Sequence, residues 1–243
     1  RSSDLGDNEI DATNLVNGKP IVYLVNVSDR IVDSSADAGL VYCLSCRNIT
    51  VRGLNLTENL FGIYLQNTSG SRIEGNLLSG NVDGIRLNGS TNSSISGNRV
   101  DDNDRGIYLD RSEGGIVKAN EVCHNRGAVF LRNSSQIVVS DNLVEENSKE
   151  GIHIEDSSKN TISENVVANN EGGIFLHRSV QNVLRANNAS GNERGVHLKG
   201  SGDNLLRTNL ISGNGCEFAV EGLNLSDLKN DIDRSNLVGG KAL

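Results

Sequence analysis

Charged side chains recur at one position of a spacing of about 22 residues along the chain. Asp110, Arg132 and Glu155 stand 22 and 23 residues apart. Carboxylates beside an arginine can form the acid–base cluster of a polysaccharide lyase. They can equally form a ladder of exposed ion pairs, each contributing about 0–1 kcal/mol. We favour the ladder, and Asp110, Arg132 and Glu155 remain the alternative sugar-binding face.

Aromatic residues follow the same spacing two positions earlier. The chain holds four Tyr and four Phe, and six of these eight rings stand in one series. We call that series the aromatic column, and it comprises Tyr23, Tyr42, Tyr64, Arg86, Tyr108, Phe130, His153, Phe175 and His197. Such a stripe can reflect β-propensity and ring stacking alone. The interpretation we prefer is an exposed contact surface for sugar rings or for another protein copy.

The four cysteines suggest no disulfide within the chain. Cys43 aligns with an inward position of the repeat and is expected to act as a small hydrophobic residue. The other three align with turn or surface positions. In an extracellular protein they would suit cross-links between copies. These residues are Cys46, Cys123 and Cys216.

N-x-(S/T) triplets permit glycosylation of a secreted protein. An Asn-, Ser- and Thr-rich repeat also generates such triplets by chance, so each one is a weak signal. The nine acceptors are Asn26, Asn48, Asn55, Asn67, Asn88, Asn92, Asn133, Asn188 and Asn224.

A repeat must position all of these residues. The pattern N-x-(apolar)-x-x-N occurs seven times, from NLLSGN at residues 76–81 to NLISGN at 209–214. Its first Asn advances by 22 residues at each step but one, which is 23. An aliphatic residue stands eleven positions before it, usually within a G-(I/V)-x-(L/I) tetrad such as GIYL. Seven copies in one register indicate a solenoid.

Period-two alternation between Gly-, Asn- and Ser-rich turns predicts strands rather than helices. We therefore predict an all-β fold, a right-handed parallel β-helix of roughly nine to ten coils. In the first tetrad, Ile63 and Leu65 should point inward and Tyr64 outward. Ile73 and Leu78 should complete the core of that coil. The two Asn series, 76–209 and 81–214, are expected to form turn ladders, in which stacked amides bond along the axis.

Composition narrows the function classes. Apolar residues make up 36% of the 243 residues, and no run of about 18 apolar residues exists that would span a membrane. The formal net charge is −8, which argues against nucleic acid as a partner. No signal-peptide pattern and no initiator Met are present, so we expect a processed or excised segment.

The repeat also carries a resemblance to a known family. The pattern G-I-x-L…N-x-I…N-x-(V/I)-x-x-N is similar to the β-helix repeats of NosD-like proteins. This family includes the periplasmic accessory protein of nitrous oxide reductase maturation and many archaeal surface proteins. The segment from NGKPIVYLVNVSD to NITVRGLNLTEN resembles the opening of modules in archaeal sheath and surface-layer proteins. The resemblance implies the fold and says little about activity.

Enzymes with this fold need an acid–base site, and copper delivery needs a metal site. The chain has no G-H-G segment, and the pairs Asp101–Asp102 and Glu145–Glu146 fall in turns. His153 and His197 are two coils apart, about 10 Å, which is too far for one copper ion. The chain also has no Met for soft coordination. We expect no enzyme activity, no catalytic residue, no cofactor and no metal.

One solenoid domain over residues 1–243 is the predicted organisation. Residues 1–38 form an N-terminal junction, 39–217 the regular coils and 218–243 a C-terminal junction. The leading functional hypothesis is a self-associating building block of a cell envelope, located at the cell surface, with copies meeting end to end or laterally. A carbohydrate-binding or carbohydrate-active β-helix is the first alternative. A periplasmic copper-delivery protein is the second.

The two ends repeat each other. NEIDATNLVNGKPI at residues 8–21 and NDIDRSNLVGGKAL at 230–243 share eight of fourteen residues. They are 222 positions apart, close to ten coils. We expect both segments to be junctions, either within a tandem array or between separate copies.

Overall fold

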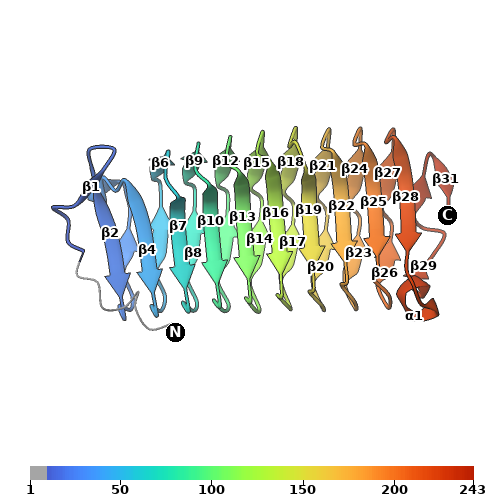
Figure 1. The fold of residues 1–243 in the computed structure, drawn as a ribbon, viewed down its shortest axis with the longest axis horizontal. Coiled ribbons are helices and arrows are strands. Elements are labelled where there is room, and N and C mark those ends of the chain that lie inside the picture. The colour runs from blue at the N-terminus through green and yellow to red at the C-terminus, as the bar shows by residue number, and fades with distance from the viewer. Residues whose placement is uncertain (1–9) are drawn as a thin grey trace.

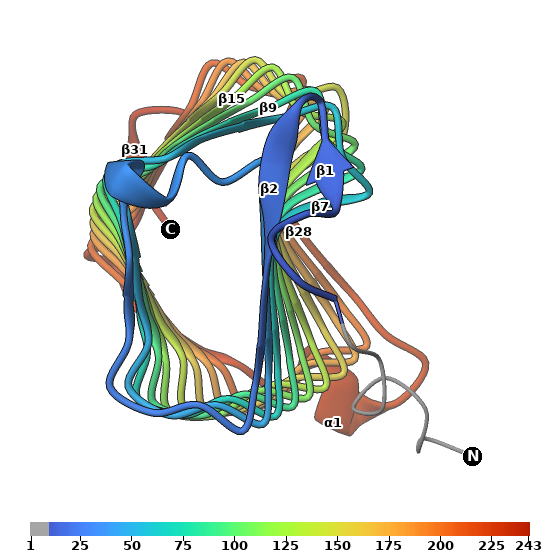
Figure 2. The same cartoon turned by 90° about the vertical axis from the view of Figure 1, so that its left-hand side faces the viewer.

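The protein is a right-handed parallel β-helix of about ten coils in the computed structural model, which describes residues 10–243. Figure 1 shows the coils side by side along one axis, with the N- and C-terminal coils at opposite ends. Figure 2 looks down that axis and shows each coil as a rounded frame of three sides. The predicted fold class is confirmed.

The first sheet has eleven strands, and all its neighbours pair in parallel except β1 and β2, which form an antiparallel hairpin. Its strands are β1 (Leu15–Val16), β2 (Lys19–Val25), β4 (Leu40–Leu44), β7 (Phe61–Gln66), β10 (Asp83–Asn88), β13 (Arg105–Asp110), β16 (Gly127–Arg132), β19 (Glu150–Glu155), β22 (Gly172–His177), β25 (Arg194–Lys199) and β28 (Cys216–Glu221).

The second sheet is parallel throughout and has ten short strands. They are β3 (Ile31–Val32), β5 (Thr50–Arg52), β8 (Arg72–Glu74), β11 (Ser94–Ser96), β14 (Ile116–Lys118), β17 (Val138–Ser140), β20 (Thr161–Ser163), β23 (Val183–Arg185), β26 (Leu205–Arg207) and β29 (Asp231–Ile232).

The third sheet also has ten strands and ends in a hairpin. They are β6 (Asn55–Thr57), β9 (Leu77–Ser79), β12 (Arg99–Asp101), β15 (Glu121–Cys123), β18 (Leu143–Glu145), β21 (Val166–Ala168), β24 (Asn188–Ser190), β27 (Leu210–Ser212), β30 (Leu237–Val238) and β31 (Lys241–Ala242). The short 3₁₀-helix η1 (Ser34–Ala36) lies in the first coil and α1 (Leu225–Leu228) in the last.

The core runs along the axis as stacked aliphatic side chains. Ile63, Leu65, Ile73 and Leu78 are fully buried, as predicted. Because each coil places its equivalents directly on these residues, the hydrophobic surface of one coil is covered only by its neighbours. Burial of each such side chain contributes about 1.5–3 kcal/mol.

The predicted asparagine ladders are present. The side-chain amide of Asn76 donates to Oδ1 of Asn98 at 2.9 Å and to the carbonyl of Val51 at 3.0 Å. Asn81 makes the equivalent bonds to Asn103 and Leu56. These Asn side chains are nearly fully buried, so the ladders satisfy backbone groups at the turns, where no sheet pairing reaches them.

The glycine of the tetrad faces the core at a point where there is no room for a side chain. A Cβ at Gly62 would lie 2.8 Å from both the Gly84 carbonyl oxygen and the core side chain of Leu78. The glycine therefore faces inward together with Ile63, and strict alternation breaks at this point. As a result, the residue before the glycine faces outward, which the alternation does not predict.

Candidate functional site

Three columns of side chains cover the outer face of the first sheet. The aromatic column is the middle one, and strand register brings Tyr42, Tyr64, Arg86, Tyr108 and Phe130 into line, as predicted. We call the column before the tetrad glycines the leading column. It comprises Phe61, Asp83, Arg105, Gly127, Glu150, Gly172, Arg194 and Cys216. The third column contains Asp110, Arg132, Glu155, His177 and Lys199.

Ring contacts run along the aromatic column, edge to face from Tyr23 to Tyr64 and stacked or tilted from Tyr108 to His197. Ring centroids of Phe130 and His153 are 4.6 Å apart, and those of His153 and Phe175 are 4.9 Å apart. Where Arg86 replaces a ring, its guanidinium lies 4.9 Å from the centroid of Tyr108. Such aromatic and cation–π contacts stabilise this arrangement of side chains.

The rings cover one another more than the sequence suggests. Tyr64 and Tyr108 are buried, with 8% and 3% of their surface exposed, which corrects the expectation of a uniformly exposed stripe. Phe130, His153 and Phe175 keep part of their surface in contact with solvent. Tyr23, Tyr42 and Arg86 are part-exposed as well, so the solvent-accessible surface of the column is interrupted at Tyr64 and Tyr108.

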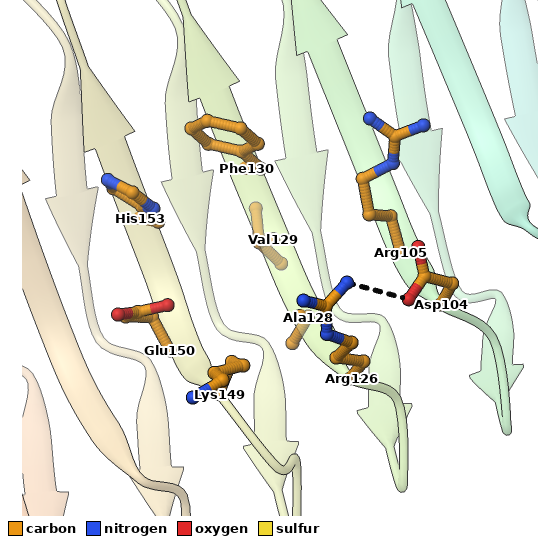
Figure 3. A pocket seen from close by; sticks show the side chains of 10 residues that line it. Asp104, Arg105, Arg126, Ala128, Val129, Phe130, Lys149, Glu150 and His153 are labelled. Atoms are coloured by element: carbon orange, nitrogen blue, oxygen red, sulfur yellow. Dashed lines mark hydrogen bonds and ion pairs between the residues drawn. The ribbon is translucent and has the colours of Figure 1, made fainter.

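A hollow of about 240 Å³ opens beside the column, between β13 and β19. Figure 3 shows Arg105, Arg126, Lys149, Glu150 and His153 around it. Gly127 forms the hollow because a Cβ there would meet no atom within 4 Å. We call this the first hollow.

A second hollow of about 100 Å³ lies on the other side of Glu150. Gly172, Phe175, Arg194 and His197 line it. Along this part of the leading column the residues are Arg105, Gly127, Glu150, Gly172 and Arg194. Glu150 lines both hollows. Each hollow combines cations, one histidine of the aromatic column and the same carboxylate.

Ion pairs hold most of the cations in place. Arg126 Nη1 lies 3.2 Å from Oδ1 of Asp104, and Lys149 Nζ lies 2.6 Å from Oε2 of Glu171. Arg105 Nε donates to Oδ1 of Asp83 at 2.5 Å. The Asp83 side chain is fully buried, and this burial raises its pKa although Arg105 and Arg86 act in the opposite direction.

Burial favours the neutral form of the two histidines that line the hollows. Burial lowers the pKa of His153, and the charges of Glu150 and Glu155 only partly oppose that effect. Burial also lowers the pKa of His197. Nε2 of His153 is buried and has no hydrogen-bond partner among the described residues. The His153 ring therefore lines the first hollow, and its Nε2 makes no hydrogen bond within the described residues.

The alternative sugar-binding face is a salt ladder in part. Arg132 Nε lies 3.6 Å from Oε2 of Glu155, as the ladder interpretation expects. Asp110 instead pairs with Arg111 at 3.1 Å and is nearly buried. Glu155 also contacts Arg178 at 3.1 Å. These three predicted residues therefore belong to local ion pairs beside the hollows.

The cysteine hypothesis needs correction. Cys46 and Cys123 are buried, with 2% and 4% exposure, so neither can cross-link copies from where it lies. Cys216 is exposed. Cys43 is buried as predicted, and its hydrogen bond with Cys46 lowers the pKa of Cys46 to about 6. Burial raises the pKa of Cys123 to about 11.

The glycosylation acceptors lie mostly on the outside. Seven are exposed, whereas Asn88 and Asn188 are half-buried strand residues. The exposed ones are Asn26, Asn48, Asn55, Asn67, Asn92, Asn133 and Asn224.

Known proteins resemble this chain in sequence and in structure. The sequence model of the NosD family, described as periplasmic copper-binding protein (NosD), matches residues 7–154 and 82–232. The chain belongs to the NosD family. No curated protein sequence matches this NosD-family chain. The archaeal surface resemblance finds no support beyond the family itself.

Solved structures share the fold at low identity. The periplasmic alginate epimerase AlgG is 19% identical with a TM-score of 0.71, over 88% of this chain and 61% of that one. The Dettilon tailspike protein is 17% identical with a TM-score of 0.68, over 89% and 54%. DFA-IIIase from Arthrobacter chlorophenolicus A6 is 16% identical with a TM-score of 0.64, over 79% and 53%. The chain thus spans between about half and two thirds of these proteins.

Two expectations change with these comparisons. The expectation that the chain is not an enzyme is wrong, because the similar structures include an alginate epimerase and DFA-IIIase. The likeness itself shows the fold. The comparisons also fit the carbohydrate alternative rather than the envelope building block. A location outside the cytoplasm, extracellular or periplasmic, agrees with the family description.

Copper does not fit the residues that the structure describes. Within residues 10–243, no three side chains of His, Cys, Asp or Glu converge closely enough to hold a metal ion. Phe175 stacks between His153 and His197 and separates them. Likewise, none of the helices in this range is long and apolar enough to cross a membrane.

Leading-column residues were missed at the sequence level. Asp83, Arg105 and Glu150 stand immediately before tetrad glycines, at the same spacing as the other columns. The signal was therefore present in the repeat. It was overlooked because strict alternation assigns an outward direction to the glycine itself, which in fact faces the core.

Proposed function

We propose that this NosD-family chain is a carbohydrate-active β-helix protein whose first sheet binds an acidic polysaccharide along the solenoid axis. The pair of hollows on either side of Glu150 is the observation that carries the proposal. Both repeat the same chemistry two coils apart on one straight face. A polymer with repeating units is the ligand that uses such a repetition.

Charge favours an acidic sugar. The chain as a whole has a formal net charge of −8. The first hollow nevertheless presents three cations, Arg105, Arg126 and Lys149, whose ion-pair partners are Asp83, Asp104 and Glu171 in turn. The carboxylate of a uronate sugar would be attracted to these cations, and charge-assisted hydrogen bonds give the stronger contacts.

Rings supply the second element of recognition. The part-exposed edges of Phe130 and Phe175 border the two hollows. Coils repeat at about 4.8 Å, which is close to the advance of one sugar unit along an extended chain. Successive sugars can therefore meet successive rungs of the aromatic column.

The chemistry assigned to the first hollow is proton transfer at the sugar carbon that bears the carboxylate. Cations around that carboxylate stabilise the negative charge that develops when the proton leaves. Burial favours the neutral form of His153, and because its Nε2 is buried, Nδ1 is the ring nitrogen that would accept the proton as a general base. In epimerisation a proton is then added to the opposite face of the same carbon. In elimination the electron pair of the broken C–H bond forms a C=C double bond, the C–O bond on the neighbouring carbon breaks with its electron pair going to oxygen, and that oxygen takes up the proton from the imidazolium.

Binding and turnover of defined polysaccharides test this proposal. Calorimetry should show binding of polymannuronate or polygalacturonate and much weaker binding of a neutral glucan. Arg126→Ala and Lys149→Ala should each reduce the affinity at least about tenfold, and added salt should weaken binding. Arg185→Ala is the matched control, because Arg185 is an exposed arginine on the second sheet, 3.5 Å from Glu164.

Turnover is tested separately with His153→Ala. Loss of proton exchange or of double-bond formation with retained binding would support the role of His153. Equal binding of acidic and neutral polymers by the native chain, or unchanged binding in both cation variants, would reject the acidic-polysaccharide proposal.

A further inference from the structure

The two similar end segments fold in the same way. We call residues 10–21 the N-terminal motif and residues 232–243 the C-terminal motif. Thr13 N donates to Oδ1 of Asp11 at 3.0 Å, and Ser235 N donates to Oδ1 of Asp233 at 3.0 Å. The first two residues of the repeated segment 8–21, Asn8 and Glu9, lie outside the described residues.

The likeness extends to the hairpins. Val16 pairs with Lys19 in β1 and β2, and Val238 pairs with Lys241 in β30 and β31. Both hairpins are closed by the same backbone bond, Ile21 N to Asn14 O at 2.9 Å in one and Leu243 N to Asn236 O at 3.1 Å in the other. The two motifs are therefore equivalent in conformation as well as in sequence.

Within residues 10–243, only the C-terminal motif is docked on a preceding coil. Asn236 is 1% exposed, and its Oδ1 accepts from the amide of Asn209 at 2.8 Å. Its own amide donates to the carbonyl of Leu206 at 2.9 Å. The backbone amides of Leu237 and Gly239 donate to Asn209 and Ile211. These bonds continue the asparagine ladder and the third sheet by one coil.

The N-terminal motif offers the same groups without that coil. Asn14 is exposed, and among the described residues its side chain bonds only to Asp11. β1 is the edge strand of the first sheet. Figures 1 and 2 place this hairpin at the N-terminal end of the solenoid, opposite the end that carries β31.

The docking contacts have equivalents in the N-terminal motif. Arg207 Nε lies 3.1 Å from Oδ2 of Asp233, whose equivalent is Asp11. Thr208 N donates to the Ser235 hydroxyl at 2.8 Å, and Thr13 supplies a hydroxyl at that position. Ile232 packs against the core, and Ile10 is its equivalent.

We infer that the C-terminal motif is a built-in cap that occupies the docking site for the N-terminal motif of a second copy of this chain. When the C-terminal motif is displaced, residues 10–21 of another copy fit on the coil around Asn209. Its β2 would then extend along the outer edge of β28, which is the last strand of the first sheet. The result is a head-to-tail solenoid continuous across the junction.

Because the C-terminal motif is covalently attached, it occupies the docking site in preference to the N-terminal motif of a second copy. A segment of the same chain acts at a high effective concentration, in the millimolar range for short connections. A second copy at lower concentration cannot compete with it for the same contacts. The inference concerns the ends of the solenoid and does not depend on the polysaccharide proposal.

Sedimentation of paired variants of the 243-residue chain tests the inference. The wild-type chain should remain monomeric over a concentration series. Asn236→Ala removes the ladder bonds of the cap, so its sedimentation coefficient should rise with concentration, and small-angle scattering should show growth along one axis. The double variant Asn14→Ala/Asn236→Ala should return to a monomer, because the incoming motif then lacks the same amide.

Ile232→Asp provides a second way to release the cap, and hydrogen exchange of residues 232–243 reports that release. Oligomers that persist when Asn14 is also replaced would overturn the inference. So would a released cap in both variants with a chain that stays monomeric at every concentration.

Discussion

The side-chain amide of Asn125 lies 3.1 Å from Oδ1 of Asn147, one coil further along the axis. The same amide donates to the carbonyl oxygens of Val100 and Cys123, and Oδ1 of Asn125 accepts from Asn103. One buried side chain thus connects three consecutive coils. Because each bond joins groups that no water reaches, the ladder contributes to the stability of every coil that it crosses.

Asn125→Ala should therefore destabilise the solenoid strongly. The substitution leaves several buried backbone groups without partners, and an unsatisfied buried group costs about 1–3 kcal/mol. We expect a loss of about 3–5 kcal/mol in the free energy of unfolding, measured by urea denaturation. Asn55→Ala, at an exposed strand position, should change it by less than about 0.5 kcal/mol. Equal effects of the two substitutions would contradict the role of the ladder.

His153 should make the protein less stable in acid. Burial lowers its pKa in the folded chain below the ordinary histidine value of about 6.5, so the unfolded chain binds the proton more readily. Stability is therefore lost as pH falls through the unfolded value, by at most about 1.4 kcal/mol per pH unit. Compared with His153→Gln, the wild-type chain should lose stability between about pH 7 and 5. Parallel pH profiles of the two proteins would contradict this assignment.

His124 should act in the opposite direction. Its Nδ1 lies 2.7 Å from Asp101 and its Nε2 2.9 Å from Glu146, and these hydrogen bonds raise its pKa. Its contribution is complete below the unfolded pKa and is lost as pH rises through the folded pKa. His124→Gln should therefore be least stable relative to wild type in acid, and the difference should shrink towards alkaline pH. A difference that grows with pH would show that the histidine is not held by these carboxylates.

Much of the architecture follows from the repeat alone. The 22-residue spacing fixes which residues stack, because a parallel solenoid repeats each position in the next coil. Ile63, Leu65, Ile73 and Leu78 and the two Asn ladders follow directly from that rule. The spacing also places the aromatic column correctly.

The 22-residue spacing does not predict how exposed each side chain is or where the two hollows form. Tyr108 is covered because Arg86 and Arg105 lie over its ring, and this contact depends on side-chain conformations that no repeat specifies. Cys46 aligns with a turn position, yet its thiol turns inward and bonds to the carbonyls of Leu24 and Leu44. Gly127 and Gly172, on either side of Glu150, leave hollows only because larger side chains surround them, and the spacing does not predict those surroundings.

Only one cysteine should react readily in the folded protein. A thiol needs both thiolate character and access to react. The pKa of Cys46 is lowered to about 6, but its burial blocks access, whereas Cys216 is exposed. Titration with a thiol reagent should find one fast thiol, which disappears in Cys216→Ser, and three that react after unfolding. Fast reaction of a second thiol in the folded chain would show that a coil around Cys43, Cys46 or Cys123 opens locally.

Gly127→Leu should close the first hollow without disturbing the fold. A Cβ at Gly127 would meet no atom within 4 Å, and the backbone there needs no left-handed conformation, so stability should change by less than about 0.5 kcal/mol. The new side chain would fill the space between Arg105 and Glu150. Affinity for an acidic polysaccharide should fall at least about tenfold, a loss of about 1.4 kcal/mol, whereas Gly127→Ala should bind nearly as well as wild type. Unchanged binding by Gly127→Leu, with a normal melting curve, would show that the ligand does not occupy this hollow.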